Sequence, residues 1–179
     1  FTYQHDLVGS ASLTLICTTT PPPPRVVINE FLAQNNSVVT DEFGEFDDWI
    51  ELHNTTDQPI SIAGWFLSDD VNNLTKYEIA AGTSIAANGY LVFYENRHFA
   101  SLADPGCHEP FGLGANGETL YLHSGSAGVL TGYSQQEKFD ASEAGVSLGR
   151  YQKSTGTYNF VAQSKATPCQ ENAAPQVGP

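Results

Sequence analysis

The segment DDWIELHNTTDQPISIAGWFLSDD, residues 47–70, predicts two β-strands around a turn, and each strand carries one of the protein's two Trp residues. Apolar and polar positions alternate in the first run, which places Ile50 and Leu52 on one face of an extended chain. The other face carries Trp49, Glu51 and His53. Ile50 and Leu52 are therefore expected in the core of a β-domain.

Similar short runs recur along the chain, separated by turn-forming Gly, Asn and Asp. The strands are expected at 25–33, 47–54, 59–62, 64–69, 75–79, 89–95, 118–123, 128–132, 146–150 and 157–161. After the turn GANG (114–117), Leu120 and Leu122 are expected to face inward and Tyr121 and His123 outward. Several short strands at this spacing predict an all-β sandwich or barrel.

Several pieces of the sequence, in this order, resemble the lamin tail domain family. They are VVINEFLAQN (26–35), DDWIELHN (47–54), PISIAGWFLSDD (59–70), GYLVFYENR (89–97), LGANGETLYLHS (113–124), SLGRY (147–151) and TPCQEN (167–172). The resemblance implies an immunoglobulin-like β-sandwich over 25–172, closest to the versions found in secreted and envelope proteins of bacteria. The sequence departs from the family at Cys169, where members commonly have Gly.

The resemblance also implies a function. It indicates a non-catalytic protein-interaction or targeting module of a larger secreted or cell-envelope protein, with an extracellular or envelope location. Its partners would be another protein or other domains of the same parent chain. Two alternatives stay open: a calcium-stabilised structural spacer, and an accessory domain of a carboxylate-based extracellular hydrolase, or such a hydrolase itself.

Four consecutive prolines divide the chain at 18–24, where they predict an extended, semi-rigid linker. Residues 1–17 contain two apolar runs around a Gly-Ser turn, which predicts an N-terminal β-hairpin that either ends an upstream domain or docks on the sandwich. Residues 173–179 are expected to form a C-terminal tail. The sequence contains no Met, and we take this to indicate a piece or mature end of a longer product.

The net charge of −13, with only seven Lys and Arg residues, argues against nucleic-acid binding, which depends on clustered cations. An acidic surface favours solubility and association with cations. No apolar stretch approaches the length of a membrane-spanning helix, so no transmembrane insertion is expected.

The sequence contains three cysteines. Cys107 and Cys169 both lie in stretches expected to be irregular, and a disulfide between them is the favoured pairing because it would tie down these loops. The alternative pairs Cys17 with one of them, since sequence does not settle connectivity.

Acidic residues gather at both ends of the 47–70 segment. If its two strands pair as neighbours, these residues meet at one end of the sandwich and offer the oxygen ligands that Ca²⁺ prefers. The candidate calcium ligands are Asp41, Glu45, Asp47, Asp48, Asp69 and Asp70. The competing explanation is that these residues cap turns.

A hydrolase would need two carboxylates converging in a pocket. Asp47, Asp48 and Glu51 form the best available set, yet Asp48 and Glu51 are expected on opposite faces of one strand. No serine-hydrolase or metalloprotease motif accompanies them, so no catalytic residues are assigned.

The outward positions of two expected strands suggest an interaction surface. This candidate band consists of Trp49, His53, Tyr121 and His123. Aromatic rings on an exposed sheet face supply apolar area with polar tips, which suits a partner chain or a carbohydrate. The alternative is that Trp49 and Trp65 are core residues and the others line a partly covered sheet.

Overall fold

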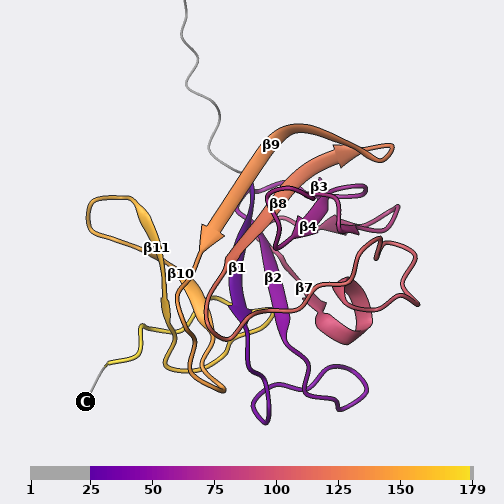
Figure 1. The fold of residues 1–179 in the computed structure, drawn as a ribbon. Helices are drawn as coiled ribbons and strands as arrows, with labels where there is room; N and C mark the ends of the chain where they lie inside the picture. Colours follow the sequence, from indigo (N-terminus) through magenta and orange to yellow (C-terminus); the bar gives the residue numbers. More distant parts are fainter. Residues whose placement is uncertain (1–24, 178–179) are drawn as a thin grey trace, which may run out of the picture.

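A computed structural model describes residues 25–177, whose regular secondary structure consists almost entirely of β-strands (Figure 1). The predicted N-terminal hairpin (1–17) and linker (18–24) lie outside the described residues. The strands are β1 (Val26–Leu32), β2 (Trp49–Asn54), β3 (Ile60–Ser61), β4 (Phe66–Ser68), β5 (Tyr77–Glu78), β6 (Ser84–Ile85), β7 (Tyr90–Tyr94), β8 (Thr119–Ser126), β9 (Val129–Lys138), β10 (Leu148–Gln152) and β11 (Tyr158–Ala162). One turn of π-helix, η1 (Glu95–Phe99), follows β7.

Two antiparallel sheets form the sandwich. The larger has five strands in the order β11-β10-β1-β2-β7, and the smaller has four in the order β5-β4-β8-β9. A two-stranded sheet, β3-β6, completes the fold. Figure 1 shows β8 and β9 crossing in front of β1, with the β10–β11 hairpin to one side. The predicted immunoglobulin-like sandwich is confirmed at this level.

The core between the sheets consists of the apolar positions predicted from alternation. Ile50 and Leu52 of β2 are 1% and 0% exposed, and Leu120 and Leu122 of β8 are 1% and 0% exposed. All four belong to one hydrophobic cluster that draws on both sheets. Phe31 of β1 lies in the same cluster, where its ring contacts those of Phe139 and Phe160.

The opposite face of the five-stranded sheet, here called the outer face, is also covered at its centre. Leu32 pairs with Trp49 and Glu30 pairs with Glu51 across β1 and β2, and all four side chains are 0% exposed. Neither Leu32 nor Trp49 belongs to the cluster between the sheets, because alternation directs them outward. A further layer of chain therefore lies over this sheet.

Gly125 of β8 marks a close approach between backbones. A Cβ at this position would overlap the Gly64 carbonyl oxygen and the Phe66 ring, whereas a Cβ on Gly132 of β9 would meet no heavy atom within 4 Å. Gly125→Ala is therefore expected to lower the free energy of unfolding by about 2–3 kcal/mol, as overpacking does. Urea denaturation followed by circular dichroism measures this loss.

The matched control is Gly132→Ala, which is expected to stay within about 0.5 kcal/mol of the parent protein. Equal unfolding midpoints for the two variants would contradict the close approach at Gly125.

Candidate functional site

An acidic loop, residues 41–47, precedes β2 and brings three of the predicted ligand residues together. Asp41, Glu45 and Asp47 each place one carboxylate oxygen within 4.8 Å of the other two. Asp41 organises the loop, because its Oδ1 accepts hydrogen bonds from the N–H groups of Phe43 (2.8 Å) and Glu45 (2.9 Å). Asp41 and Asp47 are buried, while Glu45 is exposed.

The second oxygens of the two buried aspartates have no hydrogen-bond donor. Asp47 Oδ1 accepts a hydrogen bond from Asn96 Nδ2 of η1 (2.6 Å), whereas its Oδ2 is buried without a hydrogen-bond partner. Asp41 Oδ2 is buried likewise and faces Arg97 Nε at 3.5 Å. Burial alone would raise the pKa of Asp41, but the two backbone hydrogen bonds and the charge of Arg97 hold it below its ordinary value.

The remaining predicted calcium ligands do not join this group. Asp48 Oδ1 accepts a hydrogen bond from the N–H of Asn35 (2.7 Å). Asp69 forms an ion pair with Lys76 (2.9 Å), and Asp70 Oδ1 accepts a hydrogen bond from the N–H of Asn72 (2.8 Å). The condition for one shared acidic site, that the two strands of the 47–70 segment pair as neighbours, is not met, because β2 and β4 belong to different sheets.

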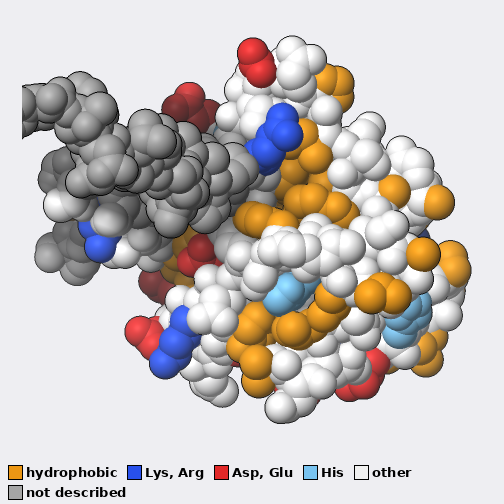
Figure 2. All heavy atoms as spheres, turned by 90° about the horizontal axis from the view of Figure 1, so that it is seen from above, with side chains coloured by type: hydrophobic (Ala, Val, Ile, Leu, Met, Phe, Trp, Pro, Cys, Tyr) orange, Lys and Arg blue, Asp and Glu red, His pale blue; other side chains and the backbone are white. Residues whose placement is uncertain are grey.

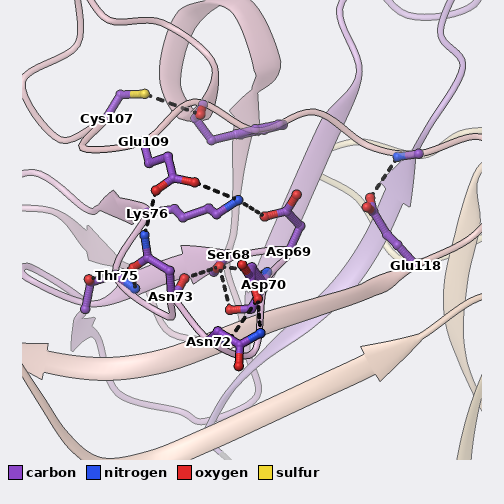
Figure 3. Close-up of polar contacts among 12 residues, drawn as sticks. Ser68, Asp69, Asp70, Asn72, Asn73, Thr75, Lys76, Cys107, Glu109 and Glu118 are labelled. Atoms are coloured by element: carbon purple, nitrogen blue, oxygen red, sulfur yellow. Dashed lines mark hydrogen bonds and ion pairs between the residues drawn. The ribbon is translucent and has the colours of Figure 1, made fainter.

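A buried lysine, Lys76, explains why an acidic residue, Asp69, stands at the C-terminal end of the 47–70 segment. The Lys76 residue is only 8% exposed, and its Nζ lies 2.9 Å from Asp69 Oδ1 and 3.3 Å from Glu109 Oε1 (Figure 3). The hydrogen bond to Asp69 is the main cause of a raised pKa of Lys76, which keeps the ammonium charged. The cation that balances the carboxylate of Asp69 is therefore the ammonium group of Lys76, a side chain of the protein itself.

The predicted interaction band does not form one surface. Trp49 is fully buried, so it is not an interaction residue. His53 lies on the outer face of the five-stranded sheet, where it stacks on Tyr90 with ring centroids 4.3 Å apart. Tyr121 and His123 lie beside each other on the outer side of β8, in the other sheet. Alternation places both pairs outward, and the sandwich separates them.

His53 contributes instead to a groove of about 740 Å³ between the β2–β7 edge and the β10–β11 hairpin. The lining of this aromatic groove includes residues 171–175 of the C-terminal segment, and its aromatic and charged members are His53, Tyr90, Arg150, Tyr151, Tyr158 and Glu171. Tyr151 and Tyr158 are 44% and 45% exposed, and the Arg150 guanidinium lies 3.3 Å above the Tyr158 ring. Burial and the charge of Arg150 hold the pKa of His53 below its ordinary value, so its ring is neutral at pH 7. Sequence patterns missed this groove, because its lining comes from segments far apart in the chain.

The C-terminal segment, residues 163–176, lies over the outer face and is fastened there by two buried glutamates. Glu30 accepts hydrogen bonds from the Thr167 N–H (3.0 Å), the Thr167 hydroxyl (2.7 Å) and the Ser147 hydroxyl. Glu51 accepts hydrogen bonds from the Cys169 N–H and from Asn29 Nδ2 (2.8 Å). The strands β1 and β2 thus carry acceptors for a segment more than a hundred residues away.

Burial controls the protonation of both glutamates. It raises the pKa of Glu30, although the bonds from Ser147 and Thr167 oppose this shift. Burial also raises the pKa of Glu51 to about 7. The hydrogen bonds from Asn29 and Cys169 lower this pKa, whereas the charge of Glu30 raises it further. Alternation predicts that Glu51 faces away from Ile50 and Leu52, but it does not show that Glu51 is buried, and no sequence pattern singles out Glu30.

A bulge in β1 adds a third anchor. The pairing with β2 shifts register between Ile28 and Glu30, which leaves Asn29 as the extra residue. Asn29 Nδ2 donates to Asn172 Oδ1 (2.7 Å), and Asn172 Nδ2 donates to the Asn29 carbonyl (3.1 Å). The bulge thus aims a side chain at the C-terminal segment.

The predicted disulfide is not formed, because Cys107 and Cys169 are both free thiols. Cys107 is buried in the cluster between the sheets, where its Sγ donates to the Phe99 carbonyl (3.4 Å; Figure 3). Cys169 is exposed on the outer face, so the five-stranded sheet separates the two. Cys169 has a φ of 62°, in the left-handed region that Gly adopts at the lowest cost.

The carboxylates considered for hydrolysis do not converge. Asp47, Asp48 and Glu51 each accept a hydrogen bond from a different part of the protein, and Glu51 is fully buried. The aromatic groove contains one carboxylate, Glu171, and a second groove, lined by residues that include Gly64, Ile79 and Gly106, also contains one, Glu78. Among residues 25–177, no helix has the length and apolarity to cross a bilayer.

The fold and these sites define an immunoglobulin-like β-sandwich of the interaction or structural kind. A family model for the lamin tail domain matches residues 19–146, and the chain belongs to this family. Domains of this family are generally non-catalytic. Comparison with curated proteins and with solved structures found no significant match.

Proposed function

We propose that the chain is a recognition module of a secreted or cell-envelope protein, and that its aromatic groove binds an extended basic segment of a partner protein. The observation that carries the proposal is the groove itself. Its lining combines the rings of His53, Tyr90 and Tyr151 with the exposed residue Glu171. Aromatic faces and a carboxylate together suit a Lys or Arg side chain.

Charge supports a basic partner over an acidic one. The chain carries a net charge of −13, so an approaching basic segment is attracted over the whole surface. The guanidinium of Arg150, which also lines the groove, is stacked on the Tyr158 ring. The carboxylate of Glu171 is thereby left to bind a cation of the partner. Glu171 lies close enough to Tyr90 to contribute, after burial and Glu51, to the raised pKa of that phenol.

The distribution of side chains on the surface supports a contribution of apolar contacts to peptide binding. Figure 2, which views the molecule from above, shows hydrophobic side chains gathered in patches beside histidines, with charged groups scattered singly. An acidic domain that also exposes apolar patches is expected to bind peptides through both contributions.

Fluorescence anisotropy with labelled ten-residue peptides of alternating Lys and Val tests this proposal. Tyr151→Ala is expected to weaken binding about three- to tenfold, the value of one aromatic contact. Glu171→Gln is expected to weaken it by a similar factor. Both side chains are exposed, so neither change endangers the fold.

Tyr121→Ala is the matched control, since it removes a partly exposed tyrosine from the other sheet. Equal binding of a Glu-Val peptide, or equal weakening by Tyr121→Ala, would contradict a basic-peptide groove. Binding of neutral oligosaccharides with no binding of the Lys-Val peptide would assign the groove to sugars instead.

A second candidate function is a calcium-stabilised spacer within a surface protein. The buried Asp47 Oδ2 atom beside two other carboxylates favours it.

A further inference from the structure

The acidic loop places negative charge in a buried position without enough positive charge to balance it. Three carboxylates, those of Asp41, Glu45 and Asp47, lie within 4.8 Å of one another. Among these three carboxylates, Arg97 forms an ion pair only with that of Asp41, at 3.5 Å. Arg97 is also shared with Glu42 at 3.6 Å and stacks on Phe43, so it does not neutralise the group.

Asp47 provides an independent observation. The residue is 3% exposed, and Asn96 Nδ2 donates to its Oδ1 at 2.6 Å. This bond fixes the carboxylate and leaves Oδ2 buried with no donor. A buried carboxylate oxygen without a partner is costly, and a bound cation is one of the partners that can satisfy it.

The spacing of the oxygens matches one hard cation. Two oxygens that bind the same Ca²⁺ at 2.3–2.6 Å lie at most about 5 Å apart, so all three carboxylates fit within one coordination shell. Glu45 is exposed, which leaves one side of the group open to water for the remaining ligands. A Ca²⁺ ion accepts six to eight oxygens in flexible geometry, whereas Mg²⁺ demands a near-ideal octahedron.

We propose that Asp41, Glu45 and Asp47 form a calcium site that ties the acidic loop to η1. Asn96 positions Asp47 through its hydrogen bond. The ion adds to the positive charge with which Arg97 partly balances Asp41. Arg97 and Asn96 of η1 already contact this loop, and a bound ion adds a further link that stabilises this end of the sandwich. The site is independent of the aromatic groove, which lies toward the other end of β2 at His53.

Thermal unfolding in Ca²⁺ titrations at constant ionic strength tests the site, with isothermal titration calorimetry for stoichiometry. Extracellular calcium modules bind in the 10⁻⁴–10⁻³ M range, so 10 mM Ca²⁺ is expected to raise Tm by about 3–10 °C. Asp47→Asn and Glu45→Gln are each expected to lose most of this rise. Glu45 is exposed, so Glu45→Gln keeps the test valid if Asp47→Asn fails to fold.

Asp57→Asn is the matched control, because it removes one exposed carboxylate at the opposite end of β2. This variant is expected to keep the full response to Ca²⁺, with one ion bound. No rise in Tm up to 10 mM Ca²⁺ would overturn the site, as would an equal response in Glu45→Gln. An equal response to Mg²⁺ would also overturn it, since that result indicates screening of a net charge of −13 rather than a built site.

Discussion

Glu30→Ala is expected to lower the free energy of unfolding by about 3–5 kcal/mol, because several buried donors would lose their acceptor together. These donors are the Thr167 N–H, the Thr167 hydroxyl and the Ser147 hydroxyl. Glu30 is 0% exposed, so water would not replace the carboxylate without opening the outer layer. Urea denaturation followed by Trp fluorescence measures the loss.

Glu143→Ala serves as the control for Glu30→Ala. It removes an exposed glutamate and is expected to change stability by no more than about 0.5 kcal/mol. A loss below about 1 kcal/mol in Glu30→Ala would show that the C-terminal segment is held by other contacts.

Raising the pH from 4 to 9 is expected to destabilise the protein through Glu51. Its pKa rises from the ordinary 4.5 to about 7 on folding, mainly through burial. Between these values the folded protein keeps a proton that the unfolded chain has released, so stability falls as pH increases. The contribution is fully present below pH 4.5 and is lost as the pH passes through about 7, for a total of about 3 kcal/mol.

Denaturation midpoints measured across this pH range, with Glu51→Gln beside the parent protein, test the assignment to Glu51. Gln has the shape of the protonated side chain and does not titrate, so the decline is expected to be much shallower in the variant. Glu95 also has a pKa raised to about 7, by burial and by Asp48, Asp47 and Glu118, and it accounts for part of the remaining decline. An unchanged slope in Glu51→Gln would assign the whole effect to other groups.

The sequence alone predicts most of the strands, because their core positions alternate locally. Ile50, Leu52, Leu120 and Leu122 are buried as expected, and a strand lies within each predicted range or overlaps it. The strand β6 and the helix η1 were missed, since two residues of strand and one helical turn carry too little pattern. Local alternation thus predicts the sandwich but not its smallest elements.

The outer layer was missed for a different reason. Alternation shows that Trp49 and Glu51 face away from Ile50, yet it does not show what lies beyond them. The covering segment follows β2 by more than a hundred residues, and its anchors are single polar contacts without a repeating pattern. A glutamate on the polar side of a strand looks the same in sequence whether it is solvated or buried.

The candidate sites show the same division. The acidic loop gathers Asp41, Glu45 and Asp47 because they are close in sequence, so that part of the predicted ligand set is brought together. Its extension to Asp69 depended on which strands pair, a long-range property that the sequence did not show. The predicted Cys107–Cys169 disulfide also depended on a long-range property. Both cysteines lie in irregular stretches, but the sequence does not show on which side of a sheet each thiol lies.

The fastening of the C-terminal segment also determines the order in which the domain is completed. The bond from Thr167 to Glu30 spans 137 residues of sequence, and that from Cys169 to Glu51 spans 118. A ribosome adding about 5–20 residues per second needs roughly 6–30 s to supply these partners after β1 and β2 have been made. Thr167 and Cys169 cannot donate to the two glutamates before that interval has passed, so the outer layer closes only when residues 167–172 arrive.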